Sequence, residues 1–547
     1  MNEEHKKPVS RVKRTLKNLL ITLLVGLIYF YFKLPAINLQ DRAFYAFFIL
    51  LAAVYCFLSI LTQGIFRSQS GKEFWENTKT HCTIPVFLCI ALLVIYFIGS
   101  LISAPIFRAR SYRDLLDVET GDFATEVEQI SFDQIPMLDE ASAMKLGDKK
   151  MGELADMVSQ FEVADDYTQI NYQDRPVRVT PLEYGDFFKW LANTSKGLPA
   201  YIIIDMVTQE SDAIRLEQGM KYSTSEYFFR NVSRHLRFQY PTYIFDTPNF
   251  EIDDEGIPYW VCPRIVKRVG LFGGDDIQGA VLMNAITGEC TYYEEVPNWV
   301  DRVYTASLII QQYDYHGMYQ NGWINSFIGQ KDVTVTTSGY NYIAINDDVY
   351  MYTGITSVGY DGSNIGFILA NQRTKETKYY ACAGAIESAA MSSAEGIVQY
   401  MDYRATFPLL LNISNQPTYF MALKDSGGLV KMYAMVNVQQ YQLVASGTTV
   451  AECERSYIEL LKTSNITTGE TVTDLAAVKG YIKELKTAVI DGNTHVFIRL
   501  DTDDFYYVIS VAESPSAAIL SEGDRVSLFP SSESGDLVSA YSVERIR

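Results

Sequence analysis

Few residues in this 547-residue chain have the spacing of a catalytic motif. Ser142-Ala-Met-Lys145 matches the pattern Ser-x-x-Lys, in which a lysine activates a serine nucleophile. The partner motifs of that enzyme class are missing, so a chance match on a polar helix is the favoured interpretation. The sequence also contains no Gly-x-Ser-x-Gly, no His-Glu-x-x-His and no phosphate-binding loop. The motifs therefore predict no catalytic residue.

Carboxylates that are distant in sequence could still form a catalytic site. A general acid and a general base can come together in the folded protein without a recognisable sequence motif. The candidates for a peptidase or wall hydrolase of this kind are Asp253, Asp254, Asp275 and Asp347. An enzyme requires that they converge in a concave, partly buried pocket. Dispersal over exposed loops favours a binding protein instead.

Neither a metal nor a cofactor is predicted. The five histidines are too scattered to suggest a metal site, and the cysteines of the body lack metal-ligand spacing. The Gly-rich stretch 270–276 falls within a hairpin loop, which is the wrong context for a nucleotide fingerprint. Cys262 and Cys290 lie on opposite arms of one predicted hairpin, so they either form a disulfide or pack as two small buried side chains.

A basic strip occupies the predicted helix around 227–238. It contains Arg230, Arg234, His235 and Arg237. The strip is either a binding surface for an acidic ligand or the solvated face of a helix, and the solvated face is favoured.

One six-residue pattern recurs and defines the architecture. Its copies are Asp205-Met-Val-Thr208-Gln-Glu210, Asn284-Ala-Ile-Thr287-Gly-Glu289 and Asn371-Gln-Arg-Thr374-Lys-Glu376, with a looser fourth copy that begins at Asn437. We interpret the pattern as a structural turn, because Asp or Asn at its head accepts a backbone N–H two residues later. Gly288 supplies a positive φ at no steric cost. The alternative, a set of cation ligands, is disfavoured because no further oxygen ligands cluster nearby.

Each copy of the pattern follows a predicted β-hairpin. The expected strand pairs are 176–181 with 200–204, 256–263 with 279–283, 349–353 with 366–369, and 417–421 with 430–435. Amphipathic helices at about 141–160, 298–315 and 387–400 can cover the apolar face of these strands. Trp260 is expected in the core of the second module.

The second copy, Pro258-Tyr-Trp-Val followed by Gly279 to Glu289, resembles the PepSY family of small extracytoplasmic domains. The body as a whole resembles a family of bacterial multi-span membrane proteins that carry tandem PepSY-like modules behind N-terminal spans. The resemblance covers about residues 130–445, and it implies binding or inhibition more than catalysis.

The first hundred residues are expected to span a membrane. Three apolar runs, at about 18–38, 43–66 and 83–107, are each long enough to cross the bilayer. Nine Lys and Arg flank them on the side of the N-terminus, and five flank them on the other side. The positive-inside rule therefore predicts a cytoplasmic N-terminus and an extracytoplasmic body.

Charge and composition limit the partners. Residues 1–113 carry a formal charge of +9 and the remainder −28, so binding of nucleic acid by the body is disfavoured. The strand-rich tail, with turns at Asp491-Gly492 and Glu522-Gly523, resembles a small barrel of OB type.

The predicted fold class is α+β, and the expected function is that of a membrane-anchored extracytoplasmic scaffold or binding protein for a protein, a peptide or a wall component. The expected domains are a three-helix anchor at 1–107, modules at 108–215, 216–297, 298–383 and 384–447, a helix and linker at 448–470, and an OB-like barrel at 471–547.

Overall fold

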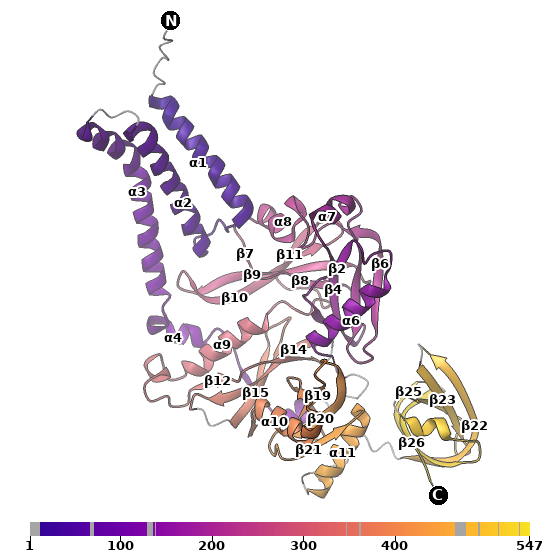
Figure 1. Ribbon diagram of the computed structural model, residues 1–547. Helices are drawn as coiled ribbons and strands as arrows, with labels where there is room; N and C mark the ends of the chain where they lie inside the picture. The colour runs from indigo at the N-terminus through magenta and orange to yellow at the C-terminus, as the bar shows by residue number, and fades with distance from the viewer. Residues whose placement is uncertain are drawn as a thin grey trace.

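The architecture follows from a computed structural model, which describes residues 11–65, 70–127, 135–136, 138–345, 347–359, 363–464, 466, 477–490, 493–511, 514–534 and 537–546. The chain is α+β, with long apolar helices at the N-terminus followed by repeated small antiparallel sheets (Figure 1).

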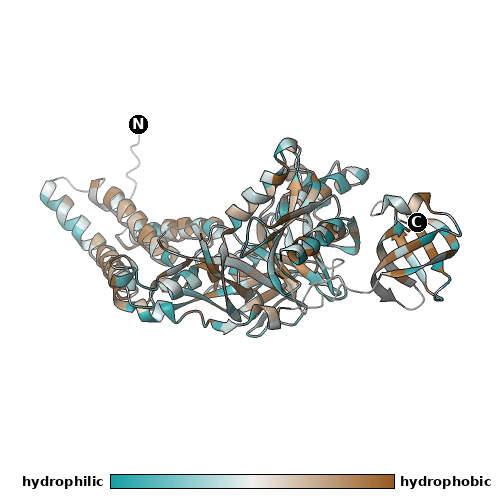
Figure 2. Cartoon of the chain, turned by 90° about the horizontal axis from the view of Figure 1, so that it is seen from below, coloured by the Kyte–Doolittle hydropathy of each residue, from teal (hydrophilic) through white to brown (hydrophobic). Residues whose placement is uncertain are grey.

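Three N-terminal helices are long and apolar enough to cross a membrane. They are α1 (Arg11–Lys33), α2 (Arg42–Ser59), which continues as the π-helix η1 (Ile60–Ile65), and α3 (Gly71–Ile102). Large hydrophobic side chains are exposed on all three helices, and much of their ribbon has the colour of hydrophobic residues in Figure 2. The third helix begins twelve residues before the predicted apolar run, because Ser70 caps its N-terminus by accepting from the Glu73 N–H. It ends at Ile102, and Pro105 starts the separate helix α4 (Pro105–Arg113).

Four units of similar construction form the body, and each contains a small antiparallel sheet. The first consists of α6 (Glu140–Glu153), β2 (Phe161–Val163), β3 (Thr168–Tyr172), β4 (Arg175–Tyr184), α7 (Phe187–Asn193), β5 (Leu198–Asp205) and β6 (Ser211–Met220). The second consists of η3 (Phe228–Arg230), α8 (Val232–Gln239), β7 (Ile244–Phe245), β8 (Asn249–Ile252), β9 (Pro258–Val269), β10 (Gly273–Asn284) and β11 (Cys290–Tyr293).

The other two units repeat the order of strands. The third consists of α9 (Ala306–Met318), η4 (Ile324–Ser326), β12 (Thr334–Thr336), β13 (Asn341–Ile345), β14 (Asp348–Ser357), β15 (Ser363–Asn371) and β16 (Thr377–Ala385). The fourth consists of α10 (Glu387–Ile397), η5 (Gln399–Met401), β17 (Arg404–Ala405), β18 (Leu409–Ile413), β19 (Gln416–Lys424), β20 (Val430–Asn437) and β21 (Val444–Gly447), and α11 (Val450–Thr463) follows it.

Every unit has the same strand pairing. A long hairpin (β4–β5, β9–β10, β14–β15 or β19–β20) lies at the centre, and the two preceding short strands both pair with its first arm. The following strand pairs with its second arm. The predicted strand pairs therefore lie on the central hairpins, and Trp260 is buried as expected, with 3% of its surface exposed.

One segment lies away from its neighbours in sequence. The strand β1 (Glu119–Gly121) pairs in parallel with β16 of the third unit, and Phe123 of α5 (Phe123–Glu126) packs in the core shared by the third and fourth units. The start of the expected 108–215 module thus belongs spatially to the third unit, because β1 covers an otherwise open sheet edge there.

The units associate in pairs through shared cores. One cluster joins the first and second units, including Val179 and Trp260. Another joins the third and fourth units, including Phe367 and Tyr419. Helix α9 connects the two pairs, because Ile309 packs with the third unit and Leu308 with the second. The body thus has two halves, each built from two units.

The tail forms a closed ring of five strands in the order β22-β23-β24-β26-β25. These strands are β22 (Val478–Ile490), β23 (Asn493–Leu500), β24 (Tyr506–Ser510), β25 (Arg525–Ser534) and β26 (Leu537–Arg545), with η6 (Pro515–Ile519) before β25. The β24–β26 pair is parallel and the other pairs are antiparallel. Its own small core includes Ile498, Ile509 and Val526.

The basic strip on α8 contacts the end of the first apolar helix. The Arg234 Nε–H donates to the Tyr31 carbonyl at 3.2 Å, and the Arg237 Nε–H donates to the Leu34 carbonyl at 2.9 Å. Carbonyls at a helix C-terminus have no partners within the helix, so arginines are suitable donors to them. The expectation of a solvated face was wrong for these two arginines, which join the body to α1.

Candidate functional site

A cavity of about 440 Å³ lies between the two halves of the body. One wall comes from the first unit and contains Gln169 of β3 and Arg178 of β4. The opposite wall comes from the third and fourth units, with Tyr342 of β13 and Phe407 before β18. Arg302, in the segment that leads from the second unit into α9, lies between them. Interfaces between domains are frequent positions of ligand sites, and this volume is in their usual range.

Gln169 and Arg178 are direct partners across the β3–β4 ladder, so their side chains lie on the same face of the sheet. They are 4% and 6% exposed. Neither amide atom of Gln169 makes a hydrogen bond with a described residue. The Nε of Arg178 also has no partner among the described residues. Arg178 Nη1 donates to the Tyr167 carbonyl at 3.0 Å. Buried polar groups are normally hydrogen-bonded, so these atoms indicate a site that accommodates a polar ligand.

Arg302 is held in place through its backbone. The carboxylate of Glu251 on β8 accepts from the N–H of Asp301 at 2.9 Å and from the N–H of Arg302 at 3.1 Å. Asp301 in turn accepts from the N–H of Asn171 on β3 at 2.7 Å. Glu251 and Asp301 are 0% and 1% exposed. Burial raises the pKa of both carboxyls above their ordinary values, and for Asp301 the nearby Glu251 raises the pKa further.

Arg178 and Arg302 are two like charges that line the same cavity. Burial lowers the pKa of Arg178, and the charge of Arg302 lowers it further, against the opposing effect of nearby carboxylates. Burial raises the pKa of Tyr342 to about 12, so its hydroxyl is a neutral hydrogen-bonding group. The inner part of the cavity is therefore positively charged and rich in hydrogen-bond donors.

Acidic residues surround the outer part. Glu140 and Asp166 are exposed. Asp139 is already paired, because the Lys424 ammonium contacts both of its carboxylate oxygens at 2.5 and 2.6 Å. Burial alone would raise the pKa of Asp139, but the bond from Lys424 holds it below the ordinary value. The cavity thus has a cationic interior and an anionic mouth.

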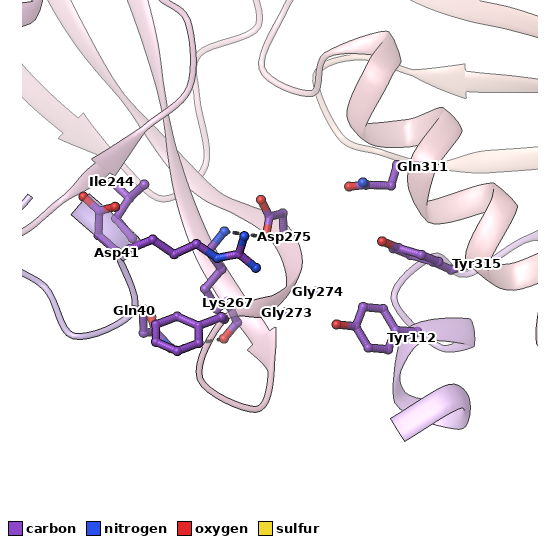
Figure 3. A pocket seen from close by; sticks show the side chains of 12 residues that line it. Gln40, Asp41, Tyr112, Ile244, Lys267, Gly273, Gly274, Asp275, Gln311 and Tyr315 are labelled. Atoms are coloured by element: carbon purple, nitrogen blue, oxygen red, sulfur yellow. Dashed lines mark hydrogen bonds and ion pairs between the residues drawn. The ribbon is translucent and has the colours of Figure 1, made fainter. Parts of the chain in front are cut away.

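A second cavity, of about 390 Å³, lies where the body meets the apolar helices (Figure 3). It is lined by Gln40 and Asp41 before α2, by the β9–β10 hairpin, and by Tyr112 and Tyr315. Lys267 and Asp275 in its wall form an ion pair of 2.5 Å. Its charged groups are more nearly balanced than those of the first cavity, which makes the cavity between the two halves the better candidate site.

Of the four candidate carboxylates, Asp275 lies apart, whereas burial and the charges of nearby carboxylates, Asp254 among them, raise the pKa of Asp347. Asp253 is buried in the β8–β9 turn, where it accepts from the N–H of Glu255 and of Ile257. Asp254 and Asp347 are exposed. Asp275 lies in the second cavity, paired with Lys267. The exposure of Asp254 and Asp347 does not fit the concave, partly buried pocket that a carboxylate enzyme requires.

In the Ser-x-x-Lys match, the lysine is engaged elsewhere, and the Ser142 hydroxyl has no hydrogen-bond partner among the described residues. Lys145 donates to the Gly427 carbonyl at 2.5 Å, and Ser142 is largely buried near the start of α6. Cys262 and Cys290 are both free thiols on β9 and β11, the two strands that flank β10, so the expectation that they lie on opposite arms of one hairpin was wrong. No group of three or more His, Cys, Asp or Glu suited to a metal occurs within the described part of the chain.

The residues of the six-residue pattern form four equivalent turns. The side-chain Oδ1 of Asp205, Asn284, Asn371 and Asn437 each accepts the N–H groups two and three residues later, at 2.8 to 3.1 Å. In the first three copies the hydroxyls of Thr208, Thr287 and Thr374 accept the N–H of Glu210, Glu289 and Glu376.

These turns also close their hairpins. The residue after each Asp or Asn donates its N–H to the carbonyl of residue 176, 258, 349 or 417, near the start of the first hairpin arm. A positive φ occurs at Gly288 and at the equivalent Gln209 and Lys375. The pattern is therefore structural, although Gln372 in the third copy also lines the cavity between the halves.

Apart from Gln372, the residues that line the cavity belong to none of the sequence motifs. The available signal was Arg178 in Pro176-Val-Arg-Val-Thr-Pro181, the only charged side chain within that otherwise apolar strand segment. Nothing in the sequence relates it to Arg302, which lies 124 positions later along the numbering of the chain.

Comparison with known proteins names no relative. No protein-family model matches the chain, and no curated protein matches it.

Proposed function

We propose that the chain is a membrane-anchored binding or scaffold protein of the cell envelope, with its body outside the cytoplasm and without enzymatic activity. The observation that carries the proposal is the cavity between the two halves, whose buried Gln169 and Arg178 have polar atoms without partners among the described residues. A ligand that supplies those partners would bind both halves at once.

Several features support the placement. Three helices suit membrane anchoring, and the basic residues favour a cytoplasmic N-terminus. The repeated helix and hairpin units, with their common turn, support modules like those of the PepSY family. The strand order of the tail, with its parallel β24–β26 pair, supports a barrel of OB type. The acidic body disfavours nucleic acid as a partner and leaves a protein, a peptide or a wall component.

The alternative is an envelope peptidase or hydrolase with a carboxylate site. Asp254 and Asp347 are exposed, and Asp275 lies apart from them in an ion pair with Lys267, which favours a binding function over this alternative. The buried Glu251 and Asp301 also support binding, because they hold backbone N–H groups and have no exposed surface from which to reach a substrate.

The test of placement is protease protection in intact cells that express the chain with an epitope after Arg547. We expect protease to remove the epitope without lysis. Protection that ends only on lysis would place the body in the cytoplasm and refute the envelope function. An epitope before Met1 is the matched control, and we expect it to stay protected until lysis.

A further inference from the structure

We propose that the cavity between the two halves binds a zwitterion, namely an α-amino acid or a short peptide, through its carboxylate and its ammonium group. This inference rests on the proposed binding function and specifies the ligand. The carboxylate would lie between Arg178 and Arg302, and the ammonium group would face Glu140 and Asp166.

The interior of the cavity favours a carboxylate. Arginine presents its N–H donors in a planar fork that matches the two oxygens of a carboxylate. Arg178 and Arg302 both retain an Nε–H that no described residue accepts, and both line the cavity. Asp139, a half-buried carboxylate of the wall, is already paired with Lys424. The carboxylates of Glu140 and Asp139 lie near enough to Arg178 to raise its pKa, but neither accepts from its Nε–H, so an anionic group from a ligand would supply that direct partner.

Gln169 adds specificity at the same place. It lies directly across the strand ladder from Arg178, and neither its amide oxygen nor its amide nitrogen has a described partner. One amide can donate to a ligand carboxylate and accept from a peptide or ammonium N–H. A side chain that is 4% exposed, with neither amide atom paired to a described residue, is costly unless a ligand or a bound water pairs with it.

The mouth of the cavity distinguishes a zwitterion from a simple anion. Glu140 and Asp166 are exposed there and would repel a phosphate or a dicarboxylate, whereas they attract an ammonium group. Tyr340, Tyr342 and Phe407 supply an aromatic surface on which the aliphatic part of a ligand can pack. A cavity of about 440 Å³ accommodates an amino acid or a short peptide.

Binding to the full-length protein in detergent tests the proposal. The probes are the twenty common amino acids, tested singly, and tri-alanine, its C-terminal amide, its N-acetyl derivative and inorganic phosphate. Thermal unfolding gives the first screen, and titration calorimetry gives the affinity. We expect at least one amino acid or tri-alanine to raise the Tm, and the preference between them identifies the source of the ligand. If tri-alanine binds, the amide and the N-acetyl derivative should bind more weakly.

Three variants connect binding to the cavity. Arg302→Met and Arg178→Met should each weaken the affinity roughly 10- to 100-fold, as expected for loss of a charge-assisted hydrogen bond. Arg302 is half-buried, so its variant remains informative if Arg178→Met fails to fold. Gln169→Leu should weaken binding and also raise the Tm of the empty protein, because it removes two unsatisfied buried atoms.

Thr180→Val on the same strand is the matched control. Its hydroxyl is buried and donates to the Ala164 carbonyl at 3.1 Å, so the variant should lower the Tm and leave the affinity unchanged.

Three results would overturn the ligand assignment. They are no Tm shift with any amino acid or tri-alanine, equal binding of tri-alanine and its amide, or binding of phosphate alone. Any of these results would refute the proposal of a zwitterionic ligand. The proposed envelope function would be kept if the protease experiment places the body outside the cytoplasm.

Discussion

Replacement of Trp260 by Ala tests the core that supports the cavity. Trp260 lies on β9, is 3% exposed, and packs edge-on against Phe250 of β8 with ring centroids 5.4 Å apart. Its indole N–H donates to the Tyr222 carbonyl at 3.0 Å. The residue after Phe250 is Glu251, which holds the backbone of Arg302, so loss of the indole also loosens the cavity wall.

The expected cost follows from the volume that is removed. Truncation of a buried tryptophan to alanine costs about 3–5 kcal/mol in free energy of unfolding. In a cooperative unit of 150 to 250 residues, each kcal/mol lowers the Tm by about 2–4 °C, so the first two units should melt roughly 6–20 °C lower.

The measurement is thermal unfolding of the full-length protein in detergent by circular dichroism, with limited proteolysis to locate the weakened half. Trp75→Ala is the control, because that indole is 65% exposed on α3 and its removal should change the stability by less than about 0.5 kcal/mol. An unchanged Tm for the Trp260 variant would show that the hairpin is placed wrongly and would refute the shared core of the first two units.

Three further predictions concern the turns and a buried acid. Asn284→Ala should cost about 1–2 kcal/mol because it removes two turn hydrogen bonds, whereas Asn284→Asp should be nearly neutral because Asp205 makes the same bonds; urea unfolding distinguishes the two. Gly288 has a φ of +78°, which favours glycine, so Gly288→Ala should lower the free energy of unfolding by about 1–3 kcal/mol. Gln209 has a φ of 62° in the equivalent turn, so Gln209→Gly should raise it by up to about 1 kcal/mol. Thermal melts test this pair, and two Tm shifts of the same sign would contradict it. Burial raises the pKa of Glu454 to about 8, so its folded form binds a proton that the unfolded chain releases near pH 4.5; stability should fall as the pH rises from about 4.5 to 8, and Glu454→Gln should flatten that slope in melts across this range.

A ligand in the cavity would contact both halves of the body. Each half has its own continuous core, and Arg302 lies in the segment that connects them. A ligand held by residues of both halves would favour one relative arrangement of the halves, because it binds only where both sets of groups converge.

Much of the architecture was predictable because its signals are local. Apolar runs of about 20 residues indicated the three N-terminal helices, and alternating strands indicated the four hairpins. The head residues of the six-residue pattern form the turns for a reason contained within a few residues: Asn284 accepts from backbone N–H groups only two and three positions away.

Other features depended on the approach of distant segments. The basic strip appeared solvated in sequence, since nothing local shows that Arg234 and Arg237 meet the end of α1 some 200 residues earlier. The pairing of β1 with β16 is of the same kind. Long-range contacts of this type are selected by burial and by the need to satisfy open edges and carbonyls, which sequence periodicity does not record.

The sequence by itself determined the order of elements, the acidic body behind an apolar N-terminal segment, and the turn that closes each hairpin. Only the tertiary structure decided where a ligand can bind. Arg178 and Gln169 are neighbours through the β3–β4 register, but Arg302 reaches them because Glu251 fixes its backbone, and the opposite wall comes from two later units. The physical reason is that a binding site depends on distances in space, and the packing of the two shared cores sets those distances.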